Sequence, residues 1–106
     1  KFYTVFQNNS GGYFINNEHV AEYLIIEAMD EYQFEERLDL ITDKYSEFCP
    51  CCGERWYSWD DEGKIAPMIY DDPVEDYINS RRNFSNREAI IYYLDGTTRK
   101  ITKGGH

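Results

Sequence analysis

The chain has 106 residues, the length of a single domain, and 42% of them are hydrophobic, which is enough for a packed core. Twenty acidic residues against eleven basic ones give a net charge of −9, so the basic surface that nucleic acid or an anionic membrane would require is lacking. No apolar run reaches the roughly 18 residues of a membrane-spanning helix.

The charge is unevenly distributed along the chain. Residues 30–76 hold fifteen Asp or Glu and four Lys or Arg, a net charge of −11, whereas residues 77–106 carry a net charge of +4. An acidic block of this size favours a partner protein with a basic surface. The three cysteines are too few and too close together for a disulfide framework, which indicates a reducing compartment. We expect one domain over residues 1–103 and a short tail at residues 104–106.

The first 28 residues predict β-structure. Phe2–Gln7 is aromatic and β-branched, as strands are. A turn cluster at residues 8–12 is expected to lead into a returning hairpin arm at residues 13–15. Residues 20–28 alternate partly between apolar and acidic side chains, and we expect them to form a central strand.

The principal helix is predicted to begin at Asp30. Asp30 and Gln33 have the spacing of a capping box, and Glu31 adds negative charge where the helix dipole favours it. The helix should end near residues 45–47, because Cys49 precedes a proline and is biased toward extended backbone. An apolar stripe on one helix face is predicted at Phe34, Leu38, Ile41, Tyr45 and Phe48.

Residues 55–59 predict a strand, which a turn should connect to a paired edge strand at residues 64–70. A short helix or loop should follow Pro73, with Val74, Tyr77 and Ile78 on one face.

A closing hairpin is predicted from residues 88–94 and 97–102, joined by a type I′ turn at Asp95-Gly96. The fold class is therefore α+β: a small antiparallel sheet packed against one principal α-helix, with a cysteine knuckle turn.

The knuckle holds all three cysteines. Cys49 and Cys52 have the spacing of a zinc knuckle, with proline to stiffen the turn and Gly53 to allow a positive φ. A structural zinc site has four ligands, and only one such pair is present. The alternative is a tight turn whose cysteines pack as small hydrophobic residues. Zinc is thus the one cofactor that the sequence suggests, and its further ligands stay open among His19, Glu54, Asp60, Asp61 and a second subunit.

The segment Cys-Pro-Cys-Cys-Gly-Glu-Arg-Trp, at residues 49–56, resembles a family of small, largely uncharacterised bacteriophage proteins. The resemblance extends to the amino-terminal residues 1–14, to the strand at residues 20–28 and to the closing Tyr93-Leu94-Asp95-Gly96. It implies a phage-encoded accessory protein in the cytoplasm of a bacterial host, and it implies no catalytic residues.

The sequence contains no recognisable catalytic arrangement. A cysteine–histidine dyad would have to use His19, with no group to orient it. Ser10-Gly11-Gly12 lacks the lysine of a phosphate-binding loop, and adjacent acids in turns are usually solvated rather than bound to Mg²⁺. We therefore expect a protein that is not an enzyme.

A row of acids is expected on the outer side of the principal helix, where residues three or four apart lie about 5–6 Å from each other. DNA also presents dense negative charge, about one per 1.7 Å of axis, so such a row could occupy a DNA-binding groove. The alternative is a solvated helix face that aids solubility. We predict a binding protein that inhibits a host defence or nucleic-acid-handling protein through an acidic and aromatic surface. The predicted partner-binding residues are Glu36, Asp39, Asp43, Glu47, Trp59, Asp60, Asp61, Asp71 and Asp72.

Two other functions stay open. Basic residues near Arg81 and Arg82, together with Arg87, Arg99 and Lys100, could bind a phosphorylated small molecule such as a nucleotide signal, unless they pair with the chain's own acids. The third reading is a zinc-stabilised structural module. The oligomeric state stays open as well.

Overall fold

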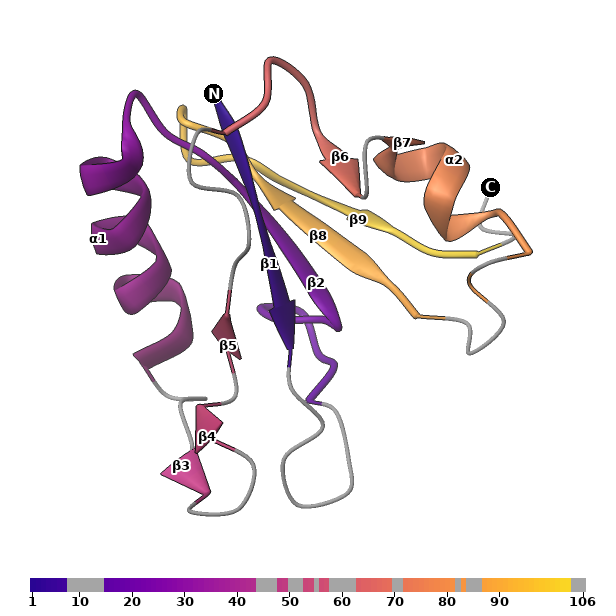
Figure 1. Cartoon of the computed structure of the whole chain (residues 1–106), viewed down its shortest axis with the longest axis horizontal. Helices are drawn as coiled ribbons and strands as arrows, with labels where there is room; N and C mark the ends of the chain where they lie inside the picture. Colours follow the sequence, from indigo (N-terminus) through magenta and orange to yellow (C-terminus); the bar gives the residue numbers. More distant parts are fainter. Residues whose placement is uncertain are drawn as a thin grey trace.

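The fold is that of a computed structural model, which describes residues 1–7, 15–43, 48–49, 53–54, 56–57, 63–69, 72–81, 83 and 87–103 (Figure 1). The two helices are α1 (Glu31–Thr42) and α2 (Val74–Ile78). The strands are β1 (Phe2–Gln7), β2 (Tyr23–Glu27), β3 (Phe48–Cys49), β4 (Gly53–Glu54), β5 (Trp56–Tyr57), β6 (Met68–Ile69), β7 (Asp72–Pro73), β8 (Ala89–Tyr92) and β9 (Thr98–Ile101).

The main sheet has five strands in the order β5-β1-β2-β8-β9. β1 pairs antiparallel with β2 and with β5, and β8 pairs antiparallel with β9, whereas β2 and β8 run parallel. The α+β class with one principal helix is thus confirmed, but the sheet is mixed rather than wholly antiparallel. A parallel pair needs a long crossover connection, and the segment between β2 and β8, which contains α1 and α2, supplies it.

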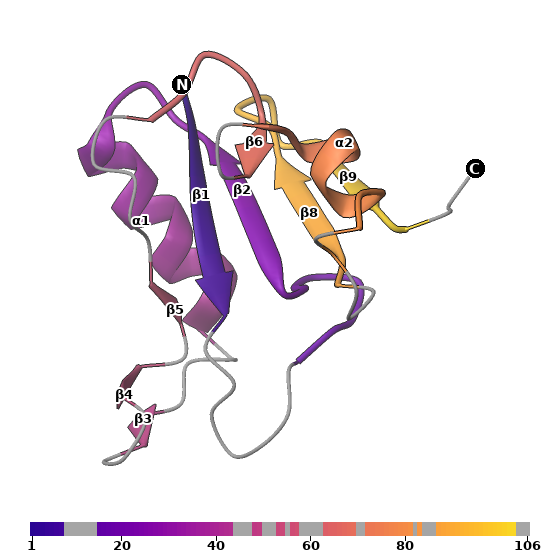
Figure 2. The same ribbon diagram turned by 45° about the vertical axis from the view of Figure 1, so that its right-hand side comes forward.

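The sheet is buried on both faces, and the side chains of β2 alternate between two hydrophobic clusters. Leu24 and Ile26 belong to the cluster that contains Phe34 of α1, whereas Tyr23 and Ile25 belong to the cluster that contains Tyr77 of α2. Because successive strand residues point to opposite faces, the two helices cover opposite sides of the sheet. Figure 2 shows α1 and α2 on either side of the strands.

Helix α1 begins as its sequence predicts. The Asp30 carboxylate accepts a hydrogen bond of 2.8 Å from the Gln33 N–H, and the Gln33 side chain accepts one from the Met29 N–H. Phe34 is buried and stacks on Tyr3 of β1, with ring centroids 4.6 Å apart. Burial raises the pKa of the Tyr3 hydroxyl, and the carboxylates of Asp30 and Glu31 raise it further.

The inner side of α1 follows the predicted stripe for three of its five positions. Leu38 and Ile41 are half-buried against the cluster that holds Phe34. The helix ends at Thr42, before the predicted end. Phe48 lies in β3 rather than on the helix, and Tyr45 lies outside the described residues. A stripe that continues past a helix end can therefore belong to a different element.

The closing hairpin is confirmed, but its turn differs from the prediction. Gly96 donates its N–H to the Tyr93 carbonyl, and Tyr93 donates its N–H to the Thr97 carbonyl. The loop therefore has three residues, and Gly96 adopts a φ of 93° at its end. This arrangement is a tight turn followed by a left-handed glycine, not the two-residue type I′ turn. Asp95 lies within the turn, where its carboxylate accepts hydrogen bonds from the N–H and hydroxyl of Thr97.

The middle of the chain forms pairs other than those predicted. β5 pairs with β1 at the edge of the main sheet, and β6 pairs with β7 in a separate two-stranded ladder. The predicted hairpin between residues 55–59 and 64–70 is therefore wrong. The position of Phe2–Gln7 explains this, because β1 leaves an open edge on which a short aromatic strand can pack. β2 is the described antiparallel neighbour of β1 along its length, and the predicted hairpin arm at residues 13–15 lies, apart from Ile15, outside the described residues.

Candidate functional site

The outer side of α1 carries a continuous set of exposed residues, which we call the acidic face. Four carboxylates follow one another at four-residue intervals, about 6 Å of helix rise apart. A second row beside them contains Glu36 between two exposed hydrophobic side chains, Tyr32 at 76% and Leu40 at 81% exposure. The members of the acidic face are Glu31, Tyr32, Glu35, Glu36, Asp39, Leu40 and Asp43.

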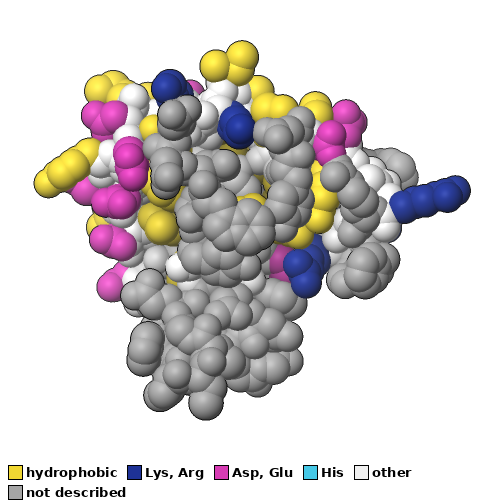
Figure 3. Space-filling view, viewed as in Figure 1, with side chains coloured by type: hydrophobic (Ala, Val, Ile, Leu, Met, Phe, Trp, Pro, Cys, Tyr) yellow, Lys and Arg dark blue, Asp and Glu magenta, His cyan; other side chains and the backbone are white. Residues whose placement is uncertain are grey.

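The carboxylates of the acidic face are not neutralised within the described part of the chain. Every ion pair recorded there lies elsewhere, at Glu18, Glu75 and Glu88. In Figure 3 the acidic side chains gather over α1 on the left of the molecule, with hydrophobic side chains projecting among them. The acidic face therefore combines exposed apolar surface with carboxylates that pair with no basic residue among those the structure describes.

The structure gathers three of the nine predicted partner-binding residues on this face. Glu36, Asp39 and Asp43 are exposed on α1, whereas Asp72 lies half-buried in β7, away from that helix. The remaining five lie outside the described residues, namely Glu47, Trp59, Asp60, Asp61 and Asp71.

Sequence reasoning missed three members of the acidic face: Glu31, Glu35 and Leu40. The spacing of Glu31, Glu35, Asp39 and Asp43 contained the signal, because residues four apart form one ridge along a helix. Leu40 lies outside the predicted apolar stripe, and the spacing of the acids gives no reason to expect an apolar residue beside them.

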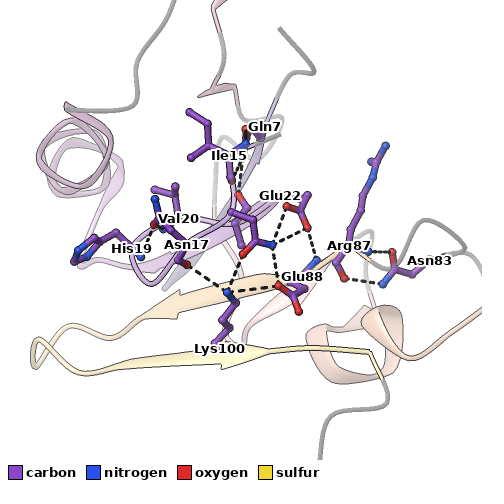
Figure 4. Close-up of polar contacts among 12 residues, drawn as sticks. Gln7, Ile15, Asn17, His19, Val20, Glu22, Asn83, Arg87, Glu88 and Lys100 are labelled. Atoms are coloured by element: carbon purple, nitrogen blue, oxygen red, sulfur yellow. Dashed lines mark hydrogen bonds and ion pairs between the residues drawn. The ribbon is translucent and has the colours of Figure 1, made fainter. Parts of the chain in front are cut away.

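A second group of charged residues, which we call the clamp, comprises Asn16, Glu22, Glu88 and Lys100 (Figure 4). The Asn16 side-chain amide donates to both carboxylates, at 3.0 Å to Glu22 and 2.8 Å to Glu88. Glu22 also accepts the Glu88 N–H at 2.8 Å. Lys100 donates to the Asn16 side-chain carbonyl at 2.8 Å and lies 3.5 Å from the Glu88 carboxylate.

The clamp holds the loop of residues 15–20 against the sheet. Asn17 accepts the N–H groups of His19 and Val20, which closes the loop on itself. Tyr92 of β8 donates its hydroxyl to the His19 carbonyl. The Gln7 side chain, buried at the end of β1, exchanges hydrogen bonds with the backbone of Ile15. Every member of the clamp thus has a structural partner, so we assign the clamp to the fold rather than to a binding site.

The basic residues of the carboxyl-terminal part are largely paired with the chain's own groups. Arg99 forms an ion pair with Glu75 at 2.6 Å, and Lys100 belongs to the clamp. Arg87 donates to the Tyr23 hydroxyl at 3.5 Å. Arg81 is exposed, and Arg82 lies outside the described residues.

The two short strands beside the cysteine segment pair antiparallel, with Cys49 of β3 opposite Gly53 of β4. The predicted knuckle turn itself, at residues 50–52, lies outside the described residues, so both the knuckle and its zinc stay predictions. Among the described residues, no three His, Cys, Asp or Glu side chains lie together as metal ligands would.

These features define a small α+β protein with one exposed acidic helix and an internally paired basic region. The chain belongs to the family described as a domain of unknown function (DUF7296), which matches residues 1–106. No curated protein and no solved structure shows significant similarity to it. In the described part of the chain, neither helix has the length and hydrophobicity to cross a membrane.

Proposed function

We propose that the chain is a non-enzymatic binding protein whose acidic face docks on a Lys- and Arg-lined surface of another protein. The observation that carries the proposal is the exposure of Tyr32 and Leu40 among five carboxylates that lack ion-pair partners in the described part. Aromatic and aliphatic side chains surrounded by charge are typical of protein interfaces, where the apolar residues supply affinity and the rim supplies specificity.

The acidic face is arranged at the expense of helix stability. Like charges four residues apart repel, by roughly 0.2–0.5 kcal/mol per pair in isolated helices. Asp39 and Asp43 also lie near the carboxyl end of α1, where the helix dipole favours cations, and the last turn contains no basic residue. A face that served solubility alone would require neither the continuous carboxylate row nor the exposed apolar side chains. This arrangement supports a role in binding.

The partner that fits best is a host protein whose basic groove ordinarily holds phosphates. The carboxylate row would compete with nucleic acid for such a groove, and opposite charges would accelerate association at low salt. The resemblance to bacteriophage proteins favours a bacterial defence or nucleic-acid-handling protein, met in the host cytoplasm. Binding would then inhibit that protein by occupying its groove.

A photo-crosslinking amino acid at position 40 of the acidic face tests the proposal in bacterial lysate. The matched control carries the same amino acid at Ile65, which is 93% exposed but lies outside the acidic face. We expect position 40 to crosslink one basic protein, identified by mass spectrometry, and position 65 not to do so. The yield should fall steeply between low and high salt.

Charge-reversal variants then show whether binding depends on the acidic face itself or only on the net charge of the chain. Glu36→Lys with Asp39→Lys should weaken binding to the crosslinked protein by more than about ten-fold, since close interfacial charge pairs are worth a few kcal/mol. Glu18→Lys with Asp76→Lys makes the same change in net charge on exposed acids elsewhere and should have little effect. Equal losses in both variants, or no loss in the first, would refute docking by the acidic face. Loss of binding only on Arg81→Ala would favour the small-molecule alternative.

A further inference from the structure

Strand β9 forms one edge of the main sheet (Figure 1). The hairpin that joins it to β8 determines which of its residues direct their backbone N–H and C=O groups toward β8 and which direct them outward. Because Tyr93 donates its N–H to Thr97, the hydrogen-bonded pairs continue at every second residue. In the register of β8 with β9 these are Ile91 with Arg99 and Ala89 with Ile101. The backbone groups of Thr98 and Lys100, which alternate with them, therefore point away from the sheet.

The outward edge of β9 is open. In the described residues, the backbone N–H and C=O groups of Thr98 and Lys100 have no hydrogen-bond partner. Edge strands are commonly guarded by charged side chains that project from the edge. Here the charged side chains stay exposed but are engaged within the chain, since Arg99 pairs with Glu75 of α2 and Lys100 with Asn16 and Glu88 in the clamp. Figure 4 shows Lys100 reaching over the sheet toward these residues.

A second copy of the chain is a poor occupant of this edge. If two β9 strands paired edge to edge, the residues whose backbone groups point outward in one strand would pair with the same kind of residue in the other. Two antiparallel registers satisfy this condition and pair most of the strand. One places Arg99 opposite its own counterpart, and the other places Lys100 opposite its own counterpart. Like charges directly opposite each other destabilise a strand pair.

The two basic residues of β9 favour an acidic occupant instead. The side chains of Arg99 and Lys100 remain 56% and 37% exposed in their ion pairs, so a neighbouring strand could reach them. Adjacent residues of an added strand lie on opposite faces, so two consecutive acids would face Arg99 on one side and Lys100 on the other. We propose that β9 accepts an extended segment of a partner protein by strand addition, with consecutive acidic residues in the segment opposite Arg99 and Lys100. Backbone hydrogen bonds to Thr98 and Lys100 would supply affinity, and the acids would set the register.

Amide hydrogen exchange in the free protein first tests which backbone N–H groups of β9 point outward. The amides of Arg99 and Ile101 should exchange slowly, because they bind β8, whereas those of Thr98 and Lys100 should exchange fast. If protection of Thr98 and Lys100 rises with protein concentration, a second copy covers the edge and the proposal is wrong.

The occupant is tested with synthetic peptides followed by NMR chemical shifts. The probe is the acetylated, amidated hexapeptide Thr-Val-Glu-Glu-Val-Thr. It should shift the amides of Thr98 and Lys100 and bind at least ten-fold more tightly than two control peptides. One control has the glutamates replaced by lysines, and the other has N-methyl groups on the amides that would face β9. Equal binding by either control, or shifts confined to other strands, would overturn strand addition by an acidic segment.

A variant of the chain adds an independent test. Thr98→Pro removes only an outward N–H, a change that edge strands tolerate, so it should abolish peptide binding while the protein stays folded. Full binding by a folded Thr98→Pro variant would contradict the proposal. If the variant does not fold, the comparison of the N-methylated peptide with its parent still decides the outcome. The acidic face plays no part in these measurements, so the outcome is independent of the proposed function.

Discussion

Glu22 and Glu36 are the same amino acid in one small chain, yet their surroundings are opposite. Glu22 is 8% exposed and accepts hydrogen bonds from Asn16 and from the Glu88 backbone, so its charge holds a loop to the sheet. Glu36 is exposed on α1 and makes no ion pair in the described part of the chain. The net charge of −9 therefore combines carboxylates that the fold uses with carboxylates that are available to a partner.

The availability of the acidic face depends on an anchor on the other side of the same helix. Phe34 is the fully buried aromatic residue of α1, and its ring stacks on Tyr3 in the sheet. Leu38 and Ile41 add half-buried contacts around it. With this inner side fixed, the outer side can carry charge and exposed apolar residues that contribute nothing to packing.

The largest expected effect tests that anchor. Phe34→Ala should lower the free energy of unfolding by about 3–5 kcal/mol, because it removes a buried aromatic ring and leaves a cavity. Leu40→Ala, on the outer side of the same helix, should change it by less than about 0.5 kcal/mol. Urea unfolding of both variants measures the difference. Similar losses in the two would mean that Leu40 is packed and that the acidic face is not an open surface.

The next effect concerns Gly63, which lies against Tyr3, the residue on which Phe34 stacks. Gly63 has a φ of 72°, and an added Cβ would lie 2.9 Å from the Tyr3 ring and 3.0 Å from the Lys1 side chain. Gly96 has a φ of 93° but nothing within 4 Å of such an atom.

Gly96→Ala should therefore cost only the backbone strain of a left-handed residue, roughly 1–2 kcal/mol. Gly63→Ala should cost about 1–3 kcal/mol more, because the overpacked Tyr3 ring must move. Thermal and urea unfolding of the two variants would compare them. Equal costs would show that Tyr3 is free to shift and that its stacking on Phe34 is loose.

The comparison between the clamp and the acidic face is tested directly by deleting one carboxylate from each. Glu22→Ala should lower the free energy of unfolding by about 1–3 kcal/mol, since it removes a buried carboxylate that accepts hydrogen bonds from the Asn16 amide and from the half-buried Glu88 N–H. Glu36→Ala should be neutral within about 0.5 kcal/mol, or slightly stabilising because it relieves repulsion along α1. A destabilising Glu36→Ala together with a neutral Glu22→Ala would reverse the assignment of the two groups.

Local patterns in the sequence were sufficient for much of the fold. The strand at Phe2–Gln7, the cap at Asp30 and the hairpin around Gly96 each depend on neighbouring residues, and each is confirmed. The pairing of β5 with β1 and of β6 with β7 depends on residues far apart, where the competing partners have equally good strand patterns. Such choices are settled by which sheet edge is left open, and no local pattern contains that information.

The candidate site was predictable only in part for a similar reason. The exposed acids Glu36, Asp39 and Asp43 follow from helical spacing, once the inner stripe is known. The spacing of Asn16 and Lys100 does not predict the clamp, because its members come from a loop, from the residues just before β2 and β8, and from β9, which meet only in the folded sheet. Leu40 lies outside the predicted stripe and was assigned to neither side of the helix, and its exposure is the observation that distinguishes this helix from an ordinary solvated one.

The smallest expected effect concerns Asp95, an exposed acid whose charge is nevertheless used by the fold. Hydrogen bonds from the Thr97 hydroxyl and N–H lower the pKa of the Asp95 carboxyl below its ordinary value of 3.8. The ionised form is therefore favoured in the folded state. Its contribution to stability is present above about pH 4 and is lost as the pH falls through the lowered folded-state pKa.

Asp95→Asn keeps an acceptor but removes the charge, so its melting temperature should lie slightly below that of the parent chain at neutral pH. The gap should close as the pH is lowered below 3.8, where the parent carboxyl becomes protonated. Thr97→Val removes the hydroxyl donor and should shrink the gap at neutral pH. A gap that stays constant down to the lowest pH would mean that the hairpin turn does not use the charge of Asp95. That acid would then belong with Glu36 rather than with Glu22, as a carboxylate that the fold leaves unused.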